Sequence, residues 1–284
     1  MKRCEMNPRI SFVIPTFNDA PAHLRQAIAS AAAQSVPAEE IIVVDDGSTR
    51  ADLLEFLGAA EERIQVLHQP NGGPSAARNA GITRAAGDYI ITLDGDDWMD
   101  PHFAAEAVRV LEDPSVEIAF PSTRHFGQED SVRHVSTDYV LKDFMEMNKV
   151  PSAAMFRRGR WAEVGGYLES LRHGMEDYEF WVRILRDGGV ARPVPTAHLH
   201  YRARENSRLA TLGTHAVRDT HQAIVEANPQ HHAILLEAAF LRLEEMYTLH
   251  LEYRSYVHKW QDRFRPLIRT RDLAKKALGK SLSL

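Results

Sequence analysis

The sequence predicts an α/β protein in which a mostly parallel sheet is flanked by helices, with a helical extension at the C-terminus. Two observations predict this class. Short apolar runs alternate with helix-length stretches over the first 120 residues, and several of these runs are apolar on both faces, which is typical of buried parallel strands. Strands separated by helices of this length predict right-handed βαβ units.

The expected elements follow in order. Strands are predicted at residues 10–14, 41–44, 64–68, 89–93 and 116–120. The helices between them are predicted at residues 22–34, 51–62, 75–86 and 101–112. Residues 121–150 are polar and irregular, a helix is expected at 175–186, and a strand at 197–202. From about residue 214 onward the pattern is helical.

Composition and charge favour a globular protein and exclude several other kinds. The 284 residues carry a formal net charge of −5 and 44% hydrophobic residues, enough for a sizeable core. The single cysteine, Cys4, excludes an intramolecular disulfide framework and favours a reducing, cytoplasmic compartment. Neither a membrane span nor a secretory signal is expected. The mild acidity gives no reason to expect nucleic acid as a partner.

Polar residues follow three of the predicted strands, where the carboxyl ends of parallel strands form the usual ligand site of an open α/β sheet. These segments are Pro15-Thr16-Phe17-Asn18, Asp45-Asp46-Gly47-Ser48 and Asp94-Gly95-Asp96-Asp97. Two of the three bring carboxylates to the same edge.

Asp94 and Asp96 are two residues apart on an extended tip, so their side chains share one face. Crowded carboxylates repel, and a hard divalent cation such as Mg²⁺ or Mn²⁺ relieves that repulsion. Gly95 would leave room for a diphosphate. The alternative is that Asp96 or Asp97 only caps the helix that begins near residue 101.

At this point the ordered motifs resemble a known family. They are Ile14-Pro15-Thr16-Phe17-Asn18, Val44-Asp45-Asp46-Gly47-Ser48, Asn71-Gly72-Gly73 with Ala77-Arg78-Asn79, Leu93-Asp94-Gly95-Asp96-Asp97, and Glu176-Asp177. Together they resemble family 2 of the inverting nucleotide-sugar glycosyltransferases, whose fold is the Rossmann-like GT-A fold. The resemblance covers residues 8–208. It implies a glycosyltransferase domain at 1–210, with a nucleotide-binding half at 8–120 and an acceptor half at 121–210, before a helical extension at 211–284.

The resemblance also implies a donor site. Residues 15–18 and Asp46 would hold the base and ribose, and Asp46 would accept a hydrogen bond from the uracil imide, which indicates a UDP-sugar. Arg78 and Asn79 would line this site from a helix. Asp94 would contact the ribose, and Asp96 would coordinate Mn²⁺ or Mg²⁺.

The acid pair Glu176-Asp177 matches the family's catalytic base. Inversion needs a carboxylate that removes the acceptor hydroxyl proton, a contribution of typically 10²–10⁴ in rate. Asp177 is assigned that role, and Glu176 would help to place the acceptor. Alternatively, both are first-turn acids favoured by the helix dipole. Trp181 on the same helix is expected to stack on an acceptor sugar, or else to pack in the core.

His198 and His200 share one face of their predicted strand. Either is expected to complete the metal site, although a strand histidine with no ligand is the alternative. Processive members carry a Q-x-x-R-W motif, and Tyr201-Arg202 offers no match. Transfer of one or a few sugars is therefore expected.

The last 31 residues hold nine Lys/Arg against two acids. Three roles are possible for this basic helical tail. It could contact the anionic inner face of a membrane, it could form a homodimer, or it could stay solvated.

The sequence thus favours an inverting, metal-dependent, hexosyltransferase-like enzyme that uses a nucleotide-sugar donor and a glycan or lipid-linked acceptor. One alternative is a nucleotidyltransferase, although residues 8–20 lack its Gly-rich basic loop. Another is a sugar-nucleotide- or glycan-binding module without turnover.

Overall fold

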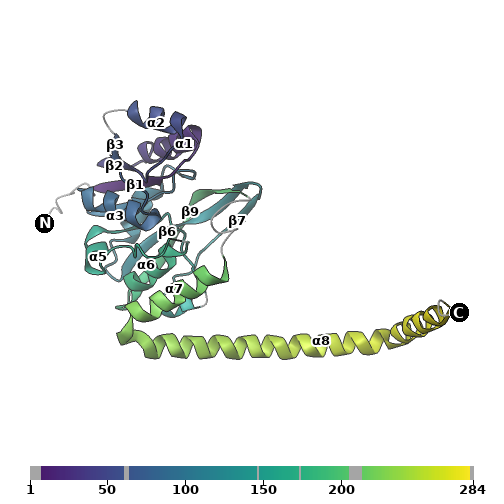
Figure 1. Ribbon diagram of the computed structural model, residues 1–284. Helices are drawn as coiled ribbons and strands as arrows, with labels where there is room; N and C mark the ends of the chain where they lie inside the picture. Colours follow the sequence, from purple (N-terminus) through teal and green to yellow (C-terminus); the bar gives the residue numbers. More distant parts are fainter. Residues whose placement is uncertain (1–7, 61–63, 146, 173, 205–212, 282–284) are drawn as a thin grey trace. The chain divides into compact units, whose positions relative to one another are not determined.

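The computed structural model describes residues 8–60, 64–145, 147–172, 174–204 and 213–281. The chain divides into one compact unit up to His232 and a second from Ala233, and each is described by itself. Within the described residues the first unit holds a nine-stranded mixed sheet in the order β3-β2-β1-β4-β8-β6-β9-β5, with β7 paired to β6 (Figure 1). The predicted α/β class is confirmed.

The first half of the sheet is parallel, as predicted. Its strands are β1 (Ile10–Thr16), β2 (Glu40–Asp45), β3 (Ile64–His68) and β4 (Tyr89–Thr92). The helices of this half are α1 (Pro21–Ala32), α2 (Ala51–Gly58), α3 (Pro74–Arg84) and α4 (Phe103–Val110). Proline opens both α1 and α3, where its missing N–H costs nothing. Helix α2 ends at Gly58, four residues before the predicted end.

The second half of the sheet is mixed and was mostly missed by the sequence pattern. Its strands are β5 (Trp98–Met99), β6 (Val116–Gly127), β7 (Ser131–Arg133), β8 (Met155–Arg157) and β9 (Val190–Ala203). The expectation that 121–150 is irregular is wrong over β6 and β7. Strand β9 begins seven residues before the predicted start at residue 197.

Prolines explain why only parts of these two long strands were predicted, residues 116–120 of β6 and 197–202 of β9. Pro121 lies inside β6, and Pro193 and Pro195 lie inside β9, whereas proline argues against a central strand. The register of β6 against β9 shifts between Pro121 and Ser122, so the strands bulge where the prolines interrupt the ladder.

Short helices complete the first unit. They are η1 (Leu141–Met145), α5 (Arg158–Glu163), α6 (Glu176–Leu185), α7 (Thr214–Ala227) and η2 (Pro229–His231). Helix α7 packs against α6. The predicted domain boundary at residue 210 stays a prediction beside the compact-unit boundary at His232.

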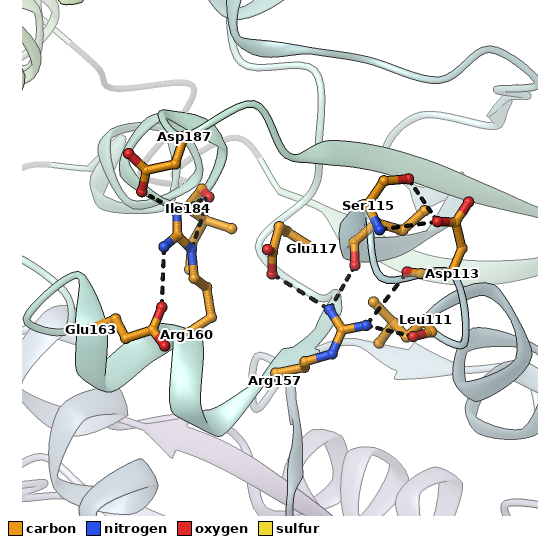
Figure 2. Close-up of polar contacts among 10 residues, drawn as sticks. Leu111, Asp113, Ser115, Glu117, Arg157, Arg160, Glu163, Ile184 and Asp187 are labelled. Atoms are coloured by element: carbon orange, nitrogen blue, oxygen red, sulfur yellow. Dashed lines mark hydrogen bonds and ion pairs between the residues drawn. The ribbon is translucent and has the colours of Figure 1, made fainter.

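Two arginines attach α5 and its strand to the rest of the unit (Figure 2). Arg157 donates to the backbone carbonyls of Leu111 and Val116. Arg160 donates to the carbonyl of Ile184, at the end of α6, and to Asp187. These bonds satisfy orphan carbonyls at a helix end and fix the position of α6.

The described residues of the second unit, from Ala233, belong to the helix α8 (His232–Ser281), which confirms that the C-terminal extension is helical. Among the described helices, none combines the length and the apolarity that a membrane crossing requires.

Candidate active site

Three strand ends meet at one edge of the sheet. Thr16 of β1 lies opposite Asp45 of β2, and β4 runs parallel to β1 on its other side. The segments that follow these strands are therefore neighbours, as predicted. A Cβ atom on Gly95 would lie only 2.8 Å from Oδ2 of Asp19 and 3.1 Å from the carbonyl oxygen of Pro15. The space that Gly95 leaves is thus taken by the turn after β1.

Asn18 ties the turn after β1 to the start of α2. Its φ of 55° is left-handed, and its side-chain oxygen accepts hydrogen bonds from the backbone N–H groups of Thr49 and Arg50 at 2.8 and 3.0 Å. This oxygen therefore holds the two residues that precede α2 against the turn after β1. Within residues 15–18 the most exposed side chain is Phe17, which is 51% exposed, whereas Thr16 is buried and donates to Asp19.

Asp46 is buried and anchors the turn before α3. Its Oδ1 accepts from Gln69 and from the backbone N–H of Gly72, and its Oδ2 accepts from the backbone N–H of Gly73 at 2.8 Å. A carboxylate offers about four acceptor positions. Two of these three bonds use Oδ1 and one uses Oδ2. Oδ2 therefore has one acceptor position left for a further N–H donor.

Arg78 links two acids from distant parts of the chain. Its guanidinium is 1% exposed and donates to Oδ1 of Asp94 and Oε1 of Glu176, both at 2.7 Å. Ser152 donates to the other oxygen of Asp94 at 2.9 Å. The two carboxylates keep the pKa of Arg78 well above its ordinary value, against the effect of burial. Arg78 thus joins α3 to the end of β4 and the start of α6.

Asn79 has a structural role, and its expected place beside the donor stays a prediction. Its side-chain oxygen accepts from Trp161 and from the backbone N–H of Tyr167, and its amide donates to Tyr167 and Glu169. These four bonds use the full hydrogen-bonding capacity of an asparagine. Asn79 therefore fixes the turn around Gly166.

Asp177 opens α6 beside Glu176. One carboxylate oxygen accepts from the side-chain amide of Asn148 at 2.9 Å, and the other from the backbone N–H of Tyr178 at 2.8 Å. Burial, and secondarily the charge of Glu176, raise the pKa of Asp177 to about 7, with Arg78 opposing the rise. A carboxyl with this pKa can exchange a proton near neutral pH.

Asp96 shares a positively charged neighbour with a second acid. It forms an ion pair with Arg204, whose guanidinium is also 3.7 Å from Asp19. Two partly exposed carboxylates thus share one positive charge, and oxygen donors of this kind suit Mg²⁺ or Mn²⁺, which usually take one or two carboxylates together with substrate phosphates. The described part of the chain contains no group of three or more His, Cys, Asp or Glu side chains placed to hold a metal.

His198 and His200 share one face, as predicted, but both contact Asp100. Nδ1 of His198 lies 3.2 Å from Asp100 Oδ2, and Nε2 of His200 lies 2.9 Å from its Oδ1. His200 also stacks on Trp98 at 3.3 Å between ring centroids. A metal role for either histidine stays a prediction.

Trp181 does not line the site, so the expectation that it stacks on an acceptor sugar is wrong. Its side chain is fully buried and packs against Phe156 and Phe180. The alternative, a core residue, is confirmed.

Three side chains of the site were not predicted from the sequence. Asn148 and Ser152 lie in a segment with no motif, and Arg204 follows the last strand. The only signal in their favour is chemical: each is a donor, and the neighbouring acids need donors.

The comparisons with known proteins decide the family. The model for "Glycosyl transferase family 2" matches residues 11–165, more than half of the chain. The chain belongs to glycosyl transferase family 2. The match covers the three strand ends and Arg78, and it stops before the Glu176-Asp177 pair.

Named relatives agree with this glycosyltransferase family. The uncharacterized glycosyltransferase YwdF of Bacillus subtilis (strain 168) is 30% identical over 201 residues, 68% of this chain and 74% of YwdF. The succinoglycan biosynthesis protein ExoW of Rhizobium meliloti (strain 1021) is 40% identical over 100 residues, 33% of this chain and 31% of ExoW. The chondroitin synthase of Pasteurella multocida (strain Pm70) is 26% identical over 190 residues, 64% of this chain. The chain spans only 19% of that synthase.

Solved structures support the GT-A-like fold. TarS 1–349 of S. aureus in complex with UDP-GlcNAc aligns with a TM-score of 0.66 at 17% identity, covering 81% of this chain and 71% of TarS 1–349. The same fragment in complex with UDP aligns with a TM-score of 0.63 at 15% identity, covering 77% of this chain and 65% of the fragment. The predicted fold is confirmed at this level.

Proposed function

We propose that this family 2 glycosyltransferase moves a sugar from a UDP-sugar to a hydroxyl group, with inversion at the anomeric carbon and Asp177 as the base. The observation that carries the proposal is the environment of Asp177. Its carboxylate is held by Asn148 and Tyr178, and its pKa is raised to about 7. Such a group is partly ionised at neutral pH, yet basic enough to take a hydroxyl proton.

The chemical step is a single nucleophilic displacement at the anomeric carbon. The acceptor oxygen forms a bond to the anomeric carbon while the bond from that carbon to the diphosphate oxygen breaks. The hydroxyl proton goes to Asp177, and the electron pair leaves with the nucleoside diphosphate. Attack from the face opposite the leaving group inverts the configuration.

Arg78 acts as a positioning residue in this scheme. Its two bonds connect Asp94, at the predicted ribose site, with Glu176, the neighbour of the base. The donor side and the acceptor side of the reaction are thereby held at a fixed separation. This replaces the expected direct contact of Arg78 with the donor.

The donor proposal rests on the remaining acceptor position of Asp46 and on the exposed ring of Phe17. A uracil imide N–H suits Oδ2 of Asp46, and an exposed aromatic ring suits a base face. The titles of the TarS structures name UDP and UDP-GlcNAc, which fits the same donor class.

Asp96 and Asp19 are proposed to hold a Mn²⁺ or Mg²⁺ ion. When bound, the ion would neutralise charge on the diphosphate.

The acceptor is proposed to be a glycan or a lipid-linked sugar, used without processivity on the cytoplasmic side of a membrane. ExoW is named for succinoglycan biosynthesis and a second relative is named a chondroitin synthase, so polysaccharide assembly is the favoured setting.

The test is UDP release from a panel of UDP-sugars with added acceptor sugars, followed by proton NMR of the product anomer. The proposal expects release from one UDP-sugar and an inverted anomer. A retained anomer would contradict the assignment of Asp177. Nucleotide binding without release from any donor would favour a non-catalytic module, and release of pyrophosphate from a nucleoside triphosphate would favour a nucleotidyltransferase.

A further inference from the structure

Helix α8, described by itself, exposes many large apolar side chains. They are Leu236, Phe240, Leu241, Leu243, Met246, Tyr247, Leu249, Leu251, Tyr253 and Tyr256, which are 46–66% exposed. An exposed set of this size on one helix marks an interaction surface rather than ordinary surface scatter.

Four of these side chains follow a heptad spacing. Met246, Leu249, Tyr253 and Tyr256 are separated by three, four and three residues, which is the a/d pattern of a coiled coil. They form one narrow stripe along the helix. Leu251 lies off this stripe, although it is also an exposed leucine.

The charges of the helix are divided between its two halves. Residues 233–253 contain four glutamates and one arginine, a net charge of −3 without histidine. Residues 254–281 contain nine Lys/Arg and two aspartates, a net charge of +7. The charge changes sign next to the middle of the apolar stripe.

We propose that α8 pairs antiparallel with α8 of a second copy of this chain, centred near Leu251. Met246 then faces the partner's Tyr256, and Leu249 faces the partner's Tyr253, so the central layers are all apolar. The acidic half of each helix lies along the basic half of the other. A parallel pair would instead align like charges along the whole length.

An anionic membrane fits this apolar stripe less well than a second copy of the chain does. The four exposed heptad side chains lie mainly in the acidic half, which an anionic surface repels. A second copy satisfies both the apolar stripe and the divided charge.

The first test compares two matched leucine variants of the full chain by sedimentation velocity. The wild-type chain is expected to sediment as a dimer at micromolar concentration. Leu249→Glu should raise the dimer dissociation constant roughly 100-fold or more, because each dimer loses two buried leucines. Leu251→Glu should leave it nearly unchanged. A monomeric wild type, or equal effects of the two variants, would overturn the proposal.

The second test determines orientation. In a Cys4→Ser background, Ala239→Cys and Arg263→Cys chains, whose substitutions continue the heptad stripe one heptad to either side, are oxidised separately and as a mixture. Antiparallel pairing predicts efficient crosslinking only in the mixture. Efficient crosslinking of each variant alone would show parallel pairing and overturn the proposal. So would monomeric chains that sediment with phosphatidylglycerol–phosphatidylcholine vesicles.

Discussion

Replacing Asp177 by asparagine should change activity and stability in opposite directions. The variant keeps the size of the side chain and an oxygen that accepts from the backbone N–H of Tyr178. Its NH2 group replaces the oxygen that accepts from Asn148, and it cannot take the proton of the acceptor hydroxyl. We expect kcat to fall about 10²–10⁴-fold, the usual contribution of a general base. UDP binding should change little, because the base contacts the acceptor side.

The stability effect follows from the pKa. The pKa of Asp177 rises from 3.8 to about 7 on folding, so the folded chain binds this proton more tightly than the unfolded chain. Wild-type stability must therefore fall as pH increases from about 4 to 7. About three pKa units correspond to at most ~4 kcal/mol above pH 7, and partial exposure of the carboxyl reduces this to about 2 kcal/mol.

The assay is thermal unfolding of the wild type and Asp177→Asn between pH 4 and pH 8. We expect the two to agree near pH 4 and the variant to unfold about 4 °C higher at pH 8. Glu179→Gln is the control, because Glu179 lies on the same helix but is paired with Arg183, so this variant should be less stable. Wild-type turnover in Asp177→Asn, or a stability difference that does not vary with pH, would refute the reasoning. The wild-type kcat/KM should also rise with pH through about 7.

Three further substitutions test the rest of the site. Arg78→Met removes the positive charge beside the buried Glu176, so the free energy of unfolding measured in urea should fall by about 3–5 kcal/mol. An unchanged urea midpoint would contradict the role of Arg78. Asp46→Asn leaves one acceptor oxygen for the N–H groups of its turn and none for the uracil imide, so UDP affinity should fall about tenfold or more by calorimetry and ADP affinity should fall less. Equal losses for ADP and UDP would show that Asp46 does not read the base. Asp96→Asn should make UDP binding insensitive to added Mn²⁺, and an unchanged Mn²⁺ response would remove Asp96 from the ligand set.

The parallel half of the sheet could be predicted because each of its strands and helices carries its own signal. The strand at residues 41–44 is apolar on both faces, and prolines mark the starts of α1 and α3. The strands of the second half depend on partners. Strand β8 has only three residues, and β6 and β9 contain prolines that a pairing with neighbouring strands tolerates at a bulge.

The site was predictable in its location but not in its internal contacts. Strand ends determine where the acids gather, so the positions of Asp46, Asp94 and Asp96 follow from local sequence. The roles of Arg78 and Asn79 depend on side chains 88 to 98 residues away, at Tyr167 and Glu176. Such pairings between residues far apart in the chain cannot be predicted from the residues next to them in sequence. Trp181 was misassigned for the same reason, because only its tertiary neighbours show that it is buried.

The most direct test of the central claim is calorimetric titration of UDP, GDP, CDP and ADP into the protein, first with Mn²⁺ and then with excess chelator. We expect UDP to bind tightly, the other three nucleotides to bind weakly, and the chelator to remove most of the UDP affinity. Binding of none of the four nucleotides would contradict the claim that this edge of the sheet is a UDP-sugar site. A preference for another nucleotide would contradict the role of Asp46 in reading uracil.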